Sequence, residues 1–151
     1  MARKTYNEKL HINGDLPKIE DFSDNPECCA KYGAKMLVAE PMQYNDVMEK
    51  IPKGKVTTIV EIRDFLAKRA GADFTCWLTG GMFQNLVANA AAERDDDLPW
   101  WRTLKKDGEL SDKYPGGVET QKKLLEAEGH KVVQKGKRFF VADYEKALAK
   151  L

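Results

Sequence analysis

Two adjacent tryptophans followed by an arginine form the stretch of this sequence with the clearest potential for binding chemistry. Trp100, Trp101 and Arg102 come directly after Pro99, and Tyr114 follows just before a Pro-Gly-Gly turn. Proline fixes the local backbone and the glycines permit tight turns, so the aromatic and cationic groups are expected to be held in one place. We therefore predict a binding site built on aromatic surfaces.

Short motifs on both sides of this stretch keep an order and spacing that are typical of one protein family. The segment 51–58 reads Ile-Pro-Lys-Gly-Lys-Val-Thr-Thr, and the later positions are Gly80, Gly81, Met82, Asp107, Gly108, Gly116, Gly117, Leu124, Leu125, Glu128 and Gly129. With Pro-Trp-Trp-Arg at 99–102, they resemble the C-terminal domain of the methylated-DNA protein cysteine methyltransferases. The sequence is most similar to the alkyltransferase-like proteins, in which tryptophan replaces the acceptor cysteine of a Pro-Cys-His-Arg motif. The resemblance covers residues 41–133.

The resemblance implies that alkyl transfer has been lost. In the transferases a base is rotated out of the duplex, and its alkyl group passes to a cysteine thiolate that a neighbouring group activates. The acceptor position falls on Trp100 and the position of the activating histidine on Trp101. An indole nitrogen is only a donor and offers neither a nucleophile nor a base near neutral pH. We therefore predict no catalytic residue, no metal and no other cofactor.

The rest of the family's pocket has counterparts in this sequence. By resemblance Tyr114 lines the alkyl pocket, Arg102 is the motif arginine, and Glu128 is a buried glutamate that could accept a hydrogen bond from Trp101. An alkyl or base pocket of Trp100, Trp101, Arg102, Tyr114 and Glu128 could stack on an extruded base. The alternative is that both tryptophans are core residues.

Two of the family's base-flipping residues are replaced. The tyrosine that pushes the target phosphate aligns with Ile59, which cannot make a polar contact, and the arginine finger aligns with Trp77. Trp77 could wedge between bases, as apolar side chains do in DNA kinks, although a core position is the commoner expectation for it.

Contacts with DNA are predicted for two groups of residues. A helix over 75–92 would be the recognition helix, and its candidate DNA-contacting residues are Trp77, Thr79, Gln84, Asn85 and Asn89. Phosphate contacts are expected from Lys53, Lys55, Lys105, Lys106, Lys135, Lys137 and Arg138. The expected partner is double-stranded DNA, alkylated or not, with a repair protein as a second partner and no membrane.

The elements that would hold these residues are mainly helical. Helices are predicted over 41–51, 58–70, 75–92 and 118–128 and after Asp143, with a strand over 35–39 and a hairpin over 130–141 turning at Lys135 and Gly136. In helix 75–92, the side chains expected to be buried are Leu78, Met82, Leu86 and Ala90. Helices 58–70 and 75–92 fit a helix-turn-helix, with an ordinary helical hairpin as the alternative. The predicted fold class is mainly α with a small β-hairpin, in a winged helix-turn-helix-like DNA-binding domain.

Residues 1–40 are predicted to form an extension packed on a main domain at 41–151, since so short a segment is too small for an independent domain. An acidic loop is expected at 93–97, before the tryptophans. It should face away from a nucleic acid because carboxylates repel phosphate.

The composition is that of a single soluble domain. The chain has 151 residues, of which 42% are hydrophobic and 32% charged, and a net charge of +1. No apolar run approaches the ~20 residues of a membrane span and the N-terminus lacks the apolar stretch of a signal peptide, so we expect a cytoplasmic protein. Three cysteines, Cys28, Cys29 and Cys76, cannot pair completely and are expected to be reduced.

Three functions are compatible with the sequence. The first is a non-catalytic DNA-binding protein that recognises O6-alkylguanine and passes it to other repair factors. The second is a DNA-binding or protein-interaction module on the same scaffold without lesion specificity, which Ile59, Trp77 and the acidic segment suggest. The third and least favoured is a methyltransferase with a relocated thiol at Cys76, where a helix dipole can favour the thiolate.

Overall fold

Helices dominate residues 4–151, which the computed structural model describes apart from the side chains of Cys28 and Cys29. The α-helices are α1 (Tyr6–Leu10), α2 (Pro26–Tyr32), α3 (Pro41–Met48), α4 (Ile59–Ala70), α5 (Trp77–Arg94) and α6 (Gly117–Ala127). Short 3-10 helices are η1 (Trp100–Arg102), η2 (Lys106–Gly108) and η3 (Tyr144–Ala147). The mainly helical prediction is confirmed. None of the helices in this part of the chain has the length and hydropathy needed to cross a bilayer.

The strands form small sheets that tie distant segments together. They are β1 (Lys18–Asp21), β2 (Lys35–Val38), β3 (Thr57–Thr58), β4 (Phe74–Thr75), β5 (Thr103–Leu104), β6 (Val132–Lys135) and β7 (Arg138–Val141). β2 pairs antiparallel with β1 and parallel with β4. β3 pairs parallel with β5, which holds the residues after the two tryptophans beside the start of α4. β6 and β7 form the antiparallel hairpin.

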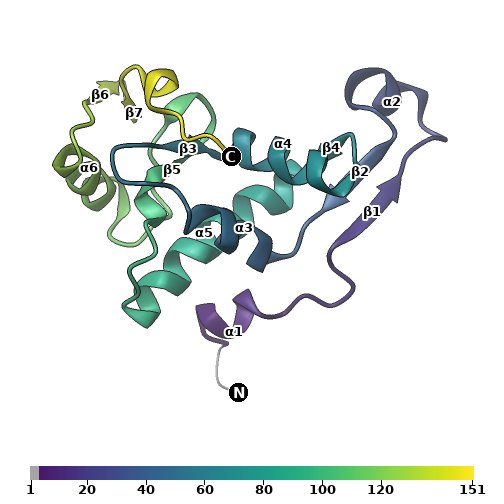
Figure 1. The fold of residues 1–151 in the computed structure, drawn as a ribbon, viewed down its shortest axis with the longest axis horizontal. Helices are drawn as coiled ribbons and strands as arrows, with labels where there is room; N and C mark the ends of the chain where they lie inside the picture. The colour runs from purple at the N-terminus through teal and green to yellow at the C-terminus, as the bar shows by residue number, and fades with distance from the viewer. Residues whose placement is uncertain (1–3) are drawn as a thin grey trace.

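Helices α4 and α5 form the helix-turn-helix-like unit that the sequence predicts. The N-cap of α4 is Thr58, whose hydroxyl accepts a hydrogen bond from the Glu61 N–H. The helix ends at Gly71, whose φ of 73° lies in the left-handed region that glycine adopts without strain. The chain then forms β4, and α5 begins after Cys76. Helices α1, α3 and α4 pack around α5, which lies at the centre of the fold (Figure 1).

The buried face of α5 differs from the predicted one. Leu78 and Met82, expected in the core, are 69% and 58% exposed, whereas Gln84, expected outside, is 2% exposed. The other buried residues of the helix are small, namely Gly80, Val87, Ala88, Ala90 and Ala91. Small side chains let neighbouring elements approach closely, and a Cβ at Gly80 would lie only 3.1 Å from the Tyr44 hydroxyl. The large apolar residues of α5 therefore did not indicate which face of the helix is buried.

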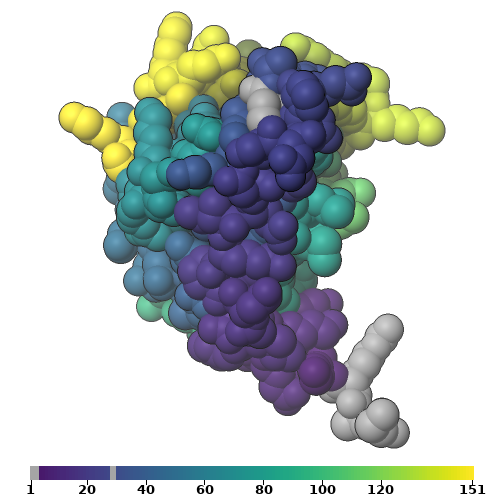
Figure 2. Space-filling view, turned by 90° about the vertical axis from the view of Figure 1, so that its right-hand side faces the viewer, coloured from purple at the N-terminus to yellow at the C-terminus, as the bar shows by residue number. Residues whose placement is uncertain are grey.

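The N-terminal segment 4–40 is fastened to the side of α5. Glu93, near the end of α5, accepts hydrogen bonds from the backbone N–H groups of Tyr6 and Asn7, each at 3.1 Å. Leu10 is almost fully buried in the main core. Figure 2 shows this segment as a band over one face of the molecule. The acidic loop predicted over 93–97 is wrong in its first half, because Glu93 and Arg94 are helical.

The predicted C-terminal hairpin is present, with Gly136 and Lys137 joining β6 to β7. Its strands pack against η2 and α6. Asp143 precedes η3, but its side chain makes no capping hydrogen bond. A capping side chain needs an extended backbone at the N-cap, and the φ of Asp143 is 54°.

Candidate nucleic-acid interface

Trp100 is the central residue of the predicted base pocket, and the structure places it inside the protein. It lies in η1 and is 7% exposed. Its ring meets those of Trp101 and Tyr114 edge-on, with centroids 5.7 and 5.5 Å apart. Edge-to-face pairs of this kind stabilise a packed interior. In this arrangement the indole is a core residue, and it has almost no free surface on which a base could stack.

Trp101 and Arg102 are held by one carboxylate. Glu128 accepts the expected hydrogen bond from Trp101 Nε1 at 3.2 Å, and its two oxygens face the Arg102 guanidinium at 2.5–3.2 Å. Arg102 also donates to the Ile51 carbonyl at 2.7 Å. Burial acts to raise the pKa of the Glu128 carboxyl, but the hydrogen bonds from Arg102 and Trp101 outweigh it, so the pKa lies below its ordinary value. The charged carboxylate therefore fixes both side chains.

Tyr114 connects this cluster to α5. Its hydroxyl donates to the Thr103 carbonyl at 2.8 Å and accepts a hydrogen bond from the Gln84 amide at 2.7 Å. Burial raises the pKa of Tyr114, so the phenol stays neutral and keeps both hydrogen bonds. Gln84 was predicted to contact DNA, but its side chain is buried and its amide serves this bond, which weighs against that role. All five predicted pocket residues thus come together, with Trp100 and Tyr114 buried and Trp101, Arg102 and Glu128 partly exposed.

The exposed edge of α5 carries large apolar side chains. Trp77 is 53% exposed, and Leu78 and Met82 are also exposed in the first half of the same helix. The Trp77 ring packs against Tyr32 of α2 and Phe74 of β4, with centroids 5.2 and 6.1 Å apart. The expectation of a core position for Trp77 is wrong, because these neighbours leave about half of it in solvent. Apolar residues gathered on a protein surface often mark a binding site. We refer to Trp77, Leu78 and Met82 together as the α5 edge.

The other α5 residues predicted to contact DNA make hydrogen bonds within the protein or are covered. Asn89 Nδ2 donates to the carbonyls of Asn85 and Lys113 at 2.8 and 3.0 Å. Asn85 Oδ1 accepts a hydrogen bond from the Ser111 hydroxyl at 3.1 Å. The Thr79 hydroxyl is buried, with no hydrogen-bond partner among the described residues. Asn85 and Asn89 therefore hold the loop before α6 against α5, a role that the sequence did not indicate.

Two of the predicted phosphate contacts are already paired with a carboxylate. Glu109 accepts a hydrogen bond from Arg138 at 2.7 Å and lies 3.8 Å from the Lys105 ammonium. The hydrogen bond from Arg138 holds the pKa of the Glu109 carboxyl below its ordinary value. Four other lysines predicted to contact phosphate are exposed, and for them the contact remains a prediction. They are Lys53, Lys55, Lys106 and Lys137.

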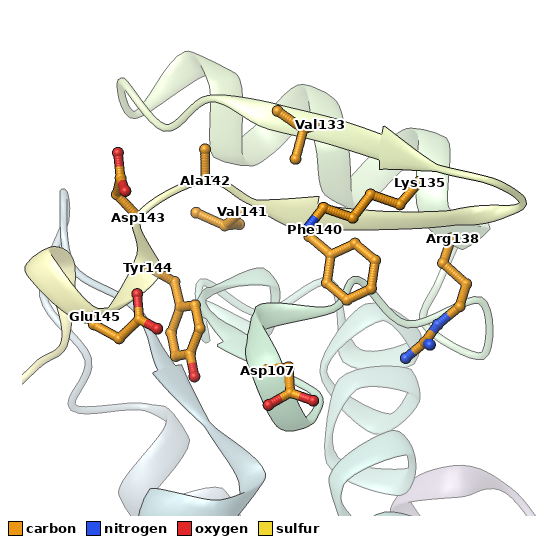
Figure 3. Close-up of a pocket in the computed structure, with 10 residues that line it drawn as sticks. All are labelled: Asp107, Val133, Lys135, Arg138, Phe140, Val141, Ala142, Asp143, Tyr144 and Glu145. Atoms are coloured by element: carbon orange, nitrogen blue, oxygen red, sulfur yellow. The ribbon is translucent and has the colours of Figure 1, made fainter.

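The hairpin surface also carries acidic groups. Lys135 and Arg138 border a hollow of about 410 Å³ whose other walls include Asp107, Asp143 and Glu145 (Figure 3). Three carboxylates and two cations share this space, and carboxylates repel a phosphate backbone. The hairpin hollow is therefore a poor phosphate site, which weighs against the predicted roles of Lys135 and Arg138.

The family is now decided by comparison with known proteins. Residues 42–130 match the family described as 6-O-methylguanine DNA methyltransferase, DNA binding domain. The chain belongs to this family. The resemblance seen in the sequence is thereby confirmed. No curated protein matches the chain in sequence.

Two solved structures share the fold. They are S. pombe Atl1 in complex with damaged DNA containing O6-carboxymethylguanine and S. pombe ATL in complex with DNA. Each is 23% identical to this chain with a TM-score of 0.54, and the match covers 74% of this chain and 94% of the other. The fold is therefore that of an alkyltransferase-like protein.

Alkyl transfer in this family would need a thiol, and Cys76 is the one cysteine whose side chain lies in the described part of this structure. It is unpaired and half-buried at the N-cap of α5. The side chains of Cys28 and Cys29 lie outside the described part of the structure. Transfer to Cys76 stays a prediction of the least favoured hypothesis.

Proposed function

We propose that this chain binds double-stranded DNA through the α5 edge. The observation that carries the proposal is the exposure of Trp77, Leu78 and Met82 on the second helix of a helix-turn-helix-like unit, in a chain whose family is a DNA-binding domain. Apolar side chains in other proteins insert between base steps from the minor groove. The cost of unstacking, a few kcal/mol per step, is offset by the surface that the bent duplex then contacts. The α5 edge presents side chains suited to this use.

We further propose that DNA binding occurs without alkyl transfer at the Trp100 position. Transfer needs a thiolate within reach of the alkyl carbon. Trp100 and Trp101 supply indoles there, and Glu128 is engaged with Trp101 and Arg102. The proposal therefore describes a binding protein that keeps the scaffold of the transferases without their chemistry.

Fluorescence anisotropy with a labelled duplex tests the binding proposal. We expect strongly salt-dependent binding, because lysines and arginines displace counterions from DNA. Met82→Asp places a carboxylate on the α5 edge and should weaken binding roughly tenfold or more, which corresponds to about 1.4 kcal/mol. Leu151→Asp is the matched control, since Leu151 is also exposed and apolar but lies at the C-terminus. Absence of binding by the wild type, or equal losses in both variants, would refute the proposal.

The mass of the intact protein tests the absence of transfer. After incubation with a duplex containing O6-methylguanine, the protein mass should be unchanged. A gain of one methyl group would overturn this part of the proposal, and its location would show whether Cys76 is the acceptor.

A second candidate function is recognition of O6-alkylguanine without transfer, followed by handover to another repair protein. The observation that favours it is that all five predicted pocket residues come together beside α5, on a fold also seen in a protein solved with damaged DNA. It requires Trp100 to leave its edge-to-face contacts so that a base can enter. A titration with an O6-methylguanine duplex and its undamaged twin decides it. Tighter binding to the damaged duplex, lost in Trp100→Ala, supports lesion recognition, whereas equal affinities exclude it.

A further inference from the structure

A hollow continues from the α5 edge along the middle of the helix. Its volume is about 300 Å³, and its apolar lining comes from Met82, Phe83 and Leu86 of α5. Two lysines from other elements complete it, Lys9 of α1 and Lys113 of the loop before α6. The hollow therefore combines an apolar helix surface with cations that neither α4 nor α5 supplies.

Helix α1 is rigidly placed beside this hollow. The Asn7 side chain donates to the Ala90 carbonyl at 3.0 Å and to Glu93 at 2.8 Å, and it accepts a hydrogen bond from Arg94 at 2.5 Å. The neighbouring Leu10 is buried in the main core. Lys9 projects from this fixed helix, and its ammonium lies 5.8 Å from the centroid of the Tyr6 ring. Its position relative to α5 is therefore set by the fold.

The loop that carries Lys113 is fixed in the same way. The backbone carbonyl of Lys113 accepts a hydrogen bond from Asn89. The hydroxyl of the next residue, Tyr114, accepts a hydrogen bond from Gln84. Both lysines are exposed, and neither ammonium has an ion-pair partner among the described residues. Because the backbone that carries each lysine is held in place, binding an anion would restrict only the lysine side chains.

We infer that the N-terminal extension forms part of the DNA interface, with Lys9 and Lys113 binding phosphates of the duplex whose bases meet the α5 edge. This inference rests on the proposed function. Phosphates flank both sides of a groove that a helix enters, and they are contacted chiefly by lysine and arginine. The region that matches the family begins at residue 42, so the contact through Lys9 is an addition of this chain to that region. Figure 2 shows the extension lying against the surface of the domain, as this role requires.

The aromatic contact between Tyr32 and Trp77, at the start of α5, also supports a role for the extension. Tyr32, which packs on Trp77, also belongs to the extension, and Lys31 lies over its ring with the ammonium 5.1 Å from the centroid. The extension therefore borders the α5 edge at Tyr32 and the adjoining hollow at Lys9.

The dependence of binding on salt tests the inference. A bound lysine contributes about 0.9 to the slope of log affinity against log salt concentration. Lys9→Gln and Lys113→Gln should each reduce the slope by about that amount, and the double variant by about twice as much. Lys123→Gln is the matched control, because Lys123 is an exposed lysine on α6 outside the hollow.

The outcomes separate this inference from the proposed function. One outcome excludes the role of the extension and leaves the proposed function standing. In that outcome the wild type binds DNA and Met82→Asp weakens binding, but the salt slope of Lys9→Gln equals that of Lys123→Gln. If the wild type does not bind DNA, both fail. Circular dichroism melts of the glutamine variants should match the wild type, since Lys9 and Lys113 are exposed and make no ion pair with the described residues.

Discussion

Glu128 carries the most concentrated set of polar contacts in the cluster around the tryptophans, and replacing it by glutamine should destabilise the protein strongly. The carboxylate faces the Arg102 guanidinium at 2.5–3.2 Å and accepts a bond from Trp101. The side chains of Glu128 and Arg102 are only 8% and 13% exposed. Glutamine preserves the shape but removes the charge, and its NH₂ group would face a donor of Arg102. The guanidinium would then be left largely buried without its counter-ion.

The expected loss follows from the burial of the pair. Removing one partner of a buried ion pair costs about 3–5 kcal/mol. We take the lower end, about 3 kcal/mol, because Arg102 retains its bond to the Ile51 carbonyl and the glutamine oxygen can still accept one bond. In a domain of this size, each kcal/mol shifts Tm by about 2–4 °C, so the melting temperature should fall by roughly 6–12 °C.

Urea unfolding followed by circular dichroism and tryptophan fluorescence measures this loss. Glu126→Gln is the matched control, because Glu126 is exposed in the last turn of α6, whose C-cap is Glu128. Arg102→Met in the Glu128→Gln background should cost less than in the wild type, since the two residues act as a pair. A loss below about 1 kcal/mol, as an exposed ion pair would give, or additive losses in the two variants would refute the reasoning.

The same carboxylate gives a pH dependence with a definite sign. The pKa of Glu128 in the folded protein lies below the ordinary value of 4.5. Its contribution to the free energy of unfolding is therefore complete above that value, and it is lost as the pH falls through the lowered folded pKa. The stability difference between the wild type and Glu128→Gln should shrink as the pH falls below about pH 4.5. A difference that grows in acid would contradict this assignment.

Two further substitutions test contacts that join distant segments. Tyr114→Phe removes the hydroxyl between Gln84 and Thr103, and leaving these buried groups without a partner should cost about 1–3 kcal/mol in urea unfolding. A Tyr144→Phe control should change stability by less than about 0.5 kcal/mol, since Tyr144 lines the open hairpin hollow. Asn7→Ala removes the bonds from α1 to Ala90, Glu93 and Arg94. Amide hydrogen exchange should then quicken over residues 6–10 and stay unchanged at the centre of α5. Equal protection of α1 in both proteins would show that Leu10 and the backbone bonds to Glu93 hold the helix without the Asn7 side chain.

Much of the local structure could be predicted from the sequence because its causes are local. Thr58 at the start of α4 and Gly71 at its end indicated the helix bounds, and runs of strand-forming residues on both sides of Gly136 predicted the hairpin. The order of the motifs also indicated the family. The orientation of α5 could not be predicted in this way. Its buried face is selected by neighbours from several elements, and Gln84 is stable inside only because Tyr114, far along the chain, accepts its hydrogen bond.

The candidate site shows the same division. By itself the sequence determined that indoles occupy the positions where the family's chemistry would need a thiol and a base, since that follows from the identities of Trp100 and Trp101. Only the tertiary structure decided that Trp100 is buried, that Trp77, Leu78 and Met82 face solvent, and that Lys9 lies beside α5. The physical reason is that burial and proximity depend on contacts between residues far apart in the chain, such as Asn7 with Glu93, which no local pattern encodes.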